Sequence, residues 1–78
     1  MQSVTVLIKE VENVKKLNRA VCSLDFEVDV RTTDEKHCLD AKSLMGLFSL
    51  DLEKPVKLVC NDVNELERLK EVVKDFIV

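Results

Sequence analysis

Two kinds of hydrophobic spacing alternate along this chain, and their order restricts the folds open to it. Residues 3–8 place apolar, mostly β-branched side chains at every second position, which predicts a strand with one buried face. The next apolar side chains are spaced by three and four positions. This spacing predicts an amphipathic helix, with Asn13 as its N-cap, that buries Val14, Leu17, Val21 and Leu24.

The middle of the chain repeats these patterns more weakly. Phe26, Val28 and Val30 alternate with charged residues and predict a second, half-buried strand. Residues 32–35 are polar and predict a turn, after which residues 36–40 predict a weaker third strand.

A second helix and a fourth strand are expected next. Residues 41–50 predict a short helix, although Gly46 inside it costs about 1 kcal/mol relative to alanine. Pro55 precedes a strand that carries Val56, Leu58 and Cys60 on one face.

The last helix has the strongest boundary signals. Asp62 and Glu65 have the spacing of a capping box, and Lys70 and Lys74 lie near the C-terminal end, where the helix dipole favours cations. Its apolar stripe is expected to comprise Val63, Leu66, Leu69, Val73 and Phe76. The predicted order is therefore β-α-β-β-α-β-α in a single domain, residues 1–78, with helices over one face of a largely antiparallel sheet.

Charge and composition exclude several classes of protein. The net charge of −3 gives no electrostatic reason to bind nucleic acid or an anionic membrane, and Lys15, Lys16 and Arg19 are expected to form a solvated helix face. No apolar run approaches the roughly 18 residues of a membrane span, and no basic segment introduces a signal peptide. We expect a cytoplasmic protein without a cofactor or metal.

The three cysteines, Cys22, Cys38 and Cys60, are odd in number and form no CxxC motif. This pattern argues against a secreted disulfide scaffold and favours reduced thiols. Because each lies in an apolar stretch, all three are expected to pack as small hydrophobic side chains.

Residues 40–50 read Asp-Ala-Lys-Ser-Leu-Met-Gly-Leu-Phe-Ser-Leu. This segment resembles the start of the second helix in HPr, the phosphocarrier of the bacterial phosphoenolpyruvate–sugar phosphotransferase system, where a Lys-Ser-Ile/Leu-Met-Gly run occurs. The predicted element order is also that of HPr. The resemblance implies an α+β, HPr-like open-faced β-sandwich, in which three helices cover one face of a four-stranded antiparallel sheet.

The phosphocarrier motif of that family is absent. HPr proteins carry a histidine between the first strand and first helix, and it accepts phosphate from Enzyme I. Here residues 8–16 contain no histidine, arginine, glycine or proline, and Glu10 and Glu12 would repel a phosphoryl group. Reversible phosphoryl transfer needs an imidazole nucleophile and cationic or N–H donors. Since His37 lies elsewhere and is expected to be an ordinary strand or surface residue, neither phosphocarrier activity nor an enzyme is expected.

A regulatory role could survive this loss. In Gram-positive relatives HPr kinase phosphorylates the serine that corresponds to Ser43, and the product binds a transcriptional regulator. Lys42 could help neutralise that phosphate. Helical spacing places Leu44, Met45 and Phe48 on one side of the helix as a docking face, and the resemblance favours exposure of Met45 and Phe48. The simpler interpretation is that Ser43 only caps a helix and the apolar residues belong to the core.

Two further hypotheses remain open at this stage. The first is a phosphotransfer component or enzyme that uses an atypical residue such as Cys22 or His37. The second is a diverged HPr-fold domain with an unrelated role. The expected partners are other proteins, namely phosphotransferase-system components, HPr kinase or a transcriptional regulator.

Overall fold

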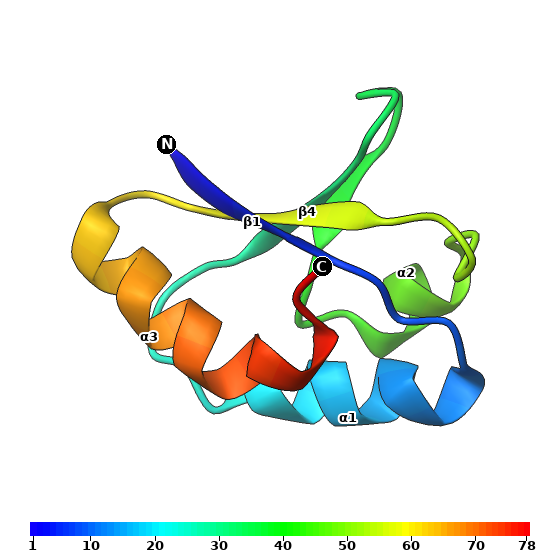
Figure 1. The fold of residues 1–78 in the computed structure, drawn as a ribbon, viewed down its shortest axis with the longest axis horizontal. Coiled ribbons are helices and arrows are strands. Elements are labelled where there is room, and N and C mark those ends of the chain that lie inside the picture. Colours follow the sequence, from blue (N-terminus) through cyan, green and yellow to red (C-terminus); the bar gives the residue numbers. More distant parts are fainter.

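The computed structural model describes all 78 residues as a sheet with helices on one side of it (Figure 1). The elements follow the predicted order: β1 (Gln2–Val6), α1 (Val11–Cys22), β2 (Asp29–Thr32), β3 (Cys38–Asp40), α2 (Leu44–Phe48), β4 (Val56–Cys60) and α3 (Val63–Val73). A short 3-10 turn, η1 (Lys74–Phe76), extends the last helix. The fold class is thus confirmed as α+β.

The four strands form one antiparallel sheet in the order β1-β4-β2-β3. Residue Val4 pairs with Leu58, and Leu58 in turn lies opposite Val30, so the apolar positions of three strands line up across the sheet. The last strand in the sequence, β4, therefore lies inside the sheet, between the N-terminal strand β1 and the β2–β3 hairpin.

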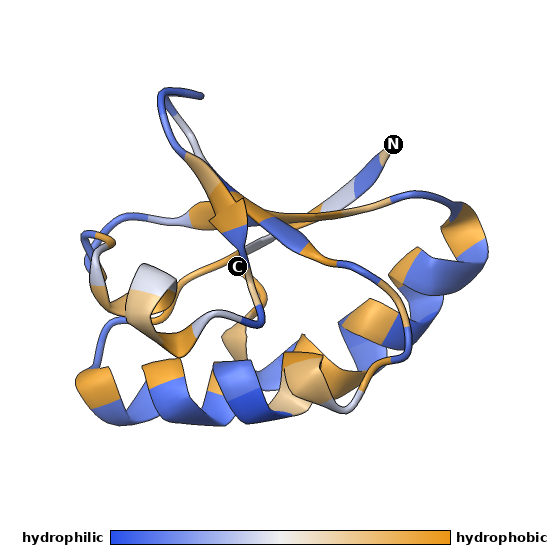
Figure 2. Cartoon of the chain, turned by 180° about the vertical axis from the view of Figure 1, so that it is seen from behind, coloured by the Kyte–Doolittle hydropathy of each residue, from blue (hydrophilic) through white to orange (hydrophobic).

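The core lies between the sheet and the helices. Figure 2 shows apolar positions on the helix surfaces that face the sheet and polar positions on the surfaces that face away. A single cluster of 17 buried residues fills this space, including the predicted helix positions Val14, Leu17 and Val21. No helix of the structure is both long enough and apolar enough to cross a membrane.

The N-terminal boundary of α1 differs from the prediction. Asn13 lies inside the first turn, where its Nδ2 donates to the carbonyl of Ile8 at 2.8 Å, and Glu10 takes the N-cap position without a side-chain cap. The predicted N-cap is wrong because the connection from β1 is short and the helix starts three residues earlier.

Other boundaries also shift. The second helix is limited to five residues because Ser43 caps it, whereas residues 41–50 were predicted. In α3, Asp62 accepts from the N–H of Glu65 at 2.8 Å, as predicted, but Glu65 reaches the N–H of Asn61 rather than that of the cap residue. Val63 is predicted to belong to the buried stripe, yet it is exposed at the first residue of α3.

The prediction for the cysteines holds for only one of them. Cys60 is buried in the core, whereas Cys22 and Cys38 are exposed. Cys22 lies at the flank of α1 beside Asn18 and the carbonyl of Lys42, and Cys38 alternates to the uncovered face of the sheet opposite Arg31. Apolar neighbours in the sequence therefore did not indicate the side to which these two residues point.

Candidate protein-binding site

The segment that carries the sequence motif folds into a short capped helix. The Oγ of Ser43 accepts from the N–H of Gly46 at 3.2 Å, and the carbonyl of Ser43 accepts from Leu47. A Cβ on Gly46 would lie 3.3 Å from both Leu39 Cδ1 and Ser43 Oγ, which is tighter than ordinary contact. The glycine therefore lets α2 lie close to β3 and to its own cap.

One apolar side chain of α2 is buried and three are exposed. Leu47 points into the core with no exposed surface, whereas Met45 is 82% exposed, Phe48 39% and Leu44 37%. The core interpretation of Leu44, Met45 and Phe48 is thus contradicted. These three residues, called the α2 patch below, form an exposed apolar surface of the kind that is enriched at protein interfaces.

Polar contacts hold the entrance of α2 against α1. Asn18 Nδ2 donates to the carbonyls of Ala41, at 3.3 Å, and Lys42, at 3.0 Å. The Nζ of Lys42 donates to the carbonyl of Leu24 at 3.0 Å. Since the Lys42 ammonium is bound to the end of α1, it serves to fix the backbone just before Ser43 and is turned away from the neutralising role expected of it.

The start of α1 carries no imidazole. Lys9 has a positive φ of 68° and lies at the centre of a three-residue turn, which is closed by the N–H of Glu10 donating to the carbonyl of Ile8 at 2.9 Å. The adjacent cavity, of about 340 Å³, is lined by Lys9, Lys16 and Asp75 together with Asn13 and apolar residues of the C-terminal segment. The cavity thus has two lysines and one aspartate, whereas Glu10 and Glu12 do not line it, and it contains no imidazole.

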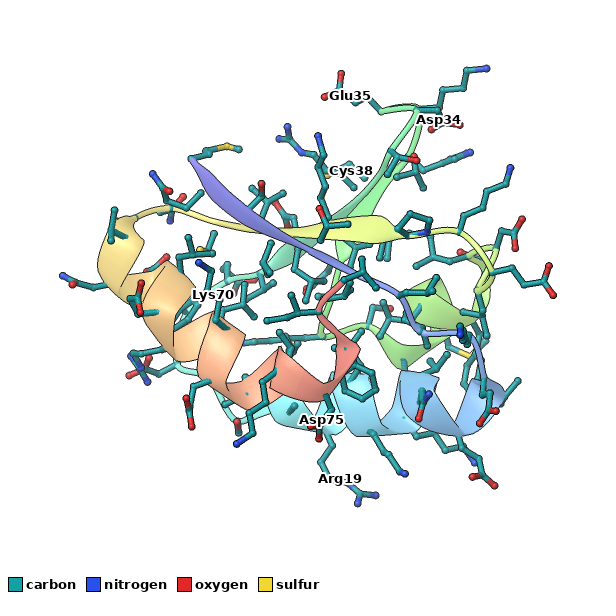
Figure 3. The ribbon with its side chains drawn as sticks, in the orientation of Figure 1. Arg19, Asp34, Glu35, Cys38, Lys70 and Asp75 are labelled. Carbon is teal, nitrogen blue, oxygen red and sulfur yellow. The ribbon has the colours of Figure 1, made fainter.

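His37 lies in a different part of the molecule. It borders a cavity of about 490 Å³ between the β2–β3 hairpin and the segment that leads from α2 to β4. The same cavity is bordered by Asp34, whose pKa is held below its ordinary value mainly by the hydrogen bond from Thr32 and then by the N–H of Lys36, with smaller effects of His37 and Lys54. Figure 3 shows Asp34 at the tip of the hairpin, away from α1.

The thiols offer no assembled site either. The pKa of Cys60 is raised, first by burial and then by Glu65 and Asp62, so this thiol stays protonated at neutral pH. No group of three or more His, Cys, Asp or Glu side chains is arranged to hold a metal ion. The α2 patch with its capping Ser43 is therefore the candidate site for binding another protein.

Together these features define an open-faced α+β sandwich with an exposed apolar patch on its second helix. The fold is similar to a crystal structure of HPr-C-His from Thermoanaerobacter tengcongensis, with a TM-score of 0.77 and 24% sequence identity, covering 97% of this chain and 91% of that chain. No family model matches this chain, and no curated protein matches it. The fold is thus that of HPr.

Proposed function

We propose that this protein is an HPr-like regulatory module that binds other proteins of the phosphotransferase system through α2 and does not carry phosphate on a histidine. The observation that carries the proposal is the exposure of the α2 patch, Leu44, Met45 and Phe48, on a helix whose backbone is fixed from both ends. An exposed apolar group on a rigid element suits docking, because little side-chain and backbone freedom is lost on binding.

The residues at the start of α1 support the proposal that the protein does not carry phosphate on a histidine. Histidine phosphorylation would need an imidazole beside N–H or cationic donors, and residues 8–16 contain lysines but no imidazole. The nearest charged groups, Lys9, Lys16 and Asp75, surround an open cavity without a nucleophile. We therefore propose neither a phosphocarrier nor an enzymatic role.

Ser43 is the proposed point of control. Its side chain is exposed at the first residue before the α2 patch. A phosphate on Ser43 would add a charge of about −1.5 to −2. Because the Lys42 ammonium is already bound to the carbonyl of Leu24, this charge would stay available to a partner beside the apolar side chains. Phosphorylation would thus turn a neutral docking face into an anionic one.

The test is parallel phosphorylation with two donors, read by intact-mass and fragment-ion mass spectrometry. HPr kinase with ATP is expected to add one phosphate to the wild type and none to Ser43→Ala. The matched control is Ser49→Ala, which removes the other exposed serine hydroxyl of the α2 region and should be labelled like the wild type. Labelling of Ser43→Ala would place the modification elsewhere and contradict the assignment.

The second arm uses Enzyme I with phosphoenolpyruvate, and no phosphate is expected on the protein. A phosphoryl group on His37 or on a thiol in this arm would support the alternative of an atypical phosphotransfer component instead. If neither arm adds phosphate, the regulatory assignment of Ser43 fails, and the HPr fold here serves an unrelated role.

A further inference from the structure

The uncovered face of the sheet carries two pairs of like charges at directly opposed positions. Asp29 on β2 lies opposite Asp40 on β3, and Arg31 on β2 lies opposite Lys57 on β4. Their neighbours Val30 and Leu58 are buried in the core, so all four charged side chains belong to the other face. Like charges that face each other across two strands destabilise a sheet.

Nothing within the molecule offsets this repulsion by an ion pair. The two ion pairs of the structure lie elsewhere, between Lys54 and Asp51 and between Arg68 and Asp25. The Nη2 of Arg31 donates to the sulfur of Met1 at 4.0 Å, and no ion pair involves Arg31. The carboxylate of Asp40 accepts from the N–H of Lys42 at 2.8 Å, but no ion pair joins either like-charged pair to an opposite charge.

Val59 lies on the same face, where neighbouring side chains already shield it from solvent. It pairs with Asp29 and is only 7% exposed, yet it is the one buried residue that does not belong to the core cluster. The helices lie on the opposite side of the sheet, so no element covers this face (Figure 1).

The charge pattern is self-complementary, and we propose that this face binds a second copy of the chain. Asp29 and Arg31 are two residues apart on β2, about 7 Å along the strand. A two-fold axis parallel to the sheet and perpendicular to its strands can pass between them. Two sheets related by this axis place Asp29 of each copy opposite Arg31 of the other, which is the reciprocal contact that a symmetric dimer requires.

The β2–β3 hairpin is compatible with this arrangement. Residues 32–37 project beyond the sheet on the side away from the helices (Figure 3). Glu35 at its tip borders a shallow hollow of about 170 Å³ together with Arg31, Lys57 and Val59. The same two-fold axis places the two hairpins at opposite ends of the interface, where they flank it without meeting.

Such a dimer is expected to be weak and sensitive to salt, because its contacts are mostly ionic. Sedimentation velocity of the whole chain, with the thiols kept reduced, should give a mass near twice 8.9 kDa at millimolar concentration and low ionic strength. At about 0.5 M salt, where screening is nearly complete over a few ångströms, the mass should fall to that of one chain.

Two charge reversals test the geometry. Asp29→Arg gives each copy two cations at these positions and Arg31→Glu gives each copy two anions, so each variant alone should be monomeric. An equimolar mixture should dimerise, because the opposite charges then meet across the two-fold axis. Both changes relieve a like-charge pair within the sheet, so the melting temperature should not fall, which separates loss of the dimer from unfolding.

Lys70→Glu, an exposed reversal on α3, is the matched control and should dimerise like the wild type. A wild type that is monomeric at low salt would overturn the proposal. So would a dimer that persists in both single reversals, since it would then use another surface, or a mixture that remains monomeric.

Discussion

The short connection from β1 to α1 forces a strained backbone conformation on one residue, Lys9. Only four residues separate β1 from α1, and Lys9 takes the left-handed region, with a φ of 68°, to make the turn. A side chain other than glycine loses roughly 1 kcal/mol or more in this conformation, because its Cβ crowds the backbone. Its N–H still donates to the carbonyl of Leu52 at 2.9 Å, which fixes the turn to the segment before β4.

Lys9→Gly should therefore stabilise the protein, by about 1 kcal/mol in the free energy of unfolding. Lys16→Gly makes the same chemical change within α1, where glycine should instead destabilise by about 1 kcal/mol. Urea titration monitored by circular dichroism measures both values. Equal destabilisation by the two variants would show that the positive φ of Lys9 carries no strain.

At the scale of elements, the caps decide where the helices begin. Asp62 and Ser43 each accept from the N–H three residues further on, at 2.8 and 3.2 Å. The cap of α3 could be predicted from the spacing of Asp62 and Glu65. The start of α1 could not be predicted in this way, because no side chain caps it. The helix begins directly after the turn at Lys9 and Glu10.

Asp62→Ala should cost about 1 kcal/mol in the free energy of unfolding, since it leaves an amide of the first turn of α3 without its acceptor. Asp62→Asn retains an acceptor oxygen and should recover most of this loss. Thermal unfolding followed at 222 nm distinguishes the two variants. If alanine and asparagine destabilise the protein equally, the charge of Asp62 rather than its hydrogen bond supports the helix.

At the scale of the whole molecule, periodicity predicted the order of elements because each buried face repeats with the period of its own backbone. The same argument does not reveal side-chain exposure in short elements. Leu44, Met45 and Leu47 all look like core residues, yet only Leu47 is buried, because five residues of α2 offer a single turn to the sheet. Spacing placed Leu44, Met45 and Phe48 on one side of the helix, but it was the resemblance of residues 40–50 to HPr that favoured exposure of Met45 and Phe48.

The reactivity of the three thiols should distinguish the exposed cysteines from the buried one. Cys22 and Cys38 should react with a maleimide or an aromatic disulfide within seconds to minutes in the native state, whereas Cys60 should remain unlabelled. Burial raises the pKa of Cys60, so this thiol should stay protonated and protected when the pH is raised to about 8.5. Mass spectrometry should count two labels in buffer and three in denaturant. Rapid native labelling of Cys60 would mean that β4 opens without global unfolding.

The central position of β4 has a consequence for synthesis of the chain on the ribosome. β1 pairs with β4, which follows it by some fifty residues, and β2 pairs with the same strand on its other edge. The nascent N-terminal half can form α1 and the β2–β3 hairpin, but it has no surface on which to seat β1. Folding must wait until residues 56–60 leave the exit tunnel, so the first strand emerges early and remains unpaired, and open to chaperones, until β4 follows it.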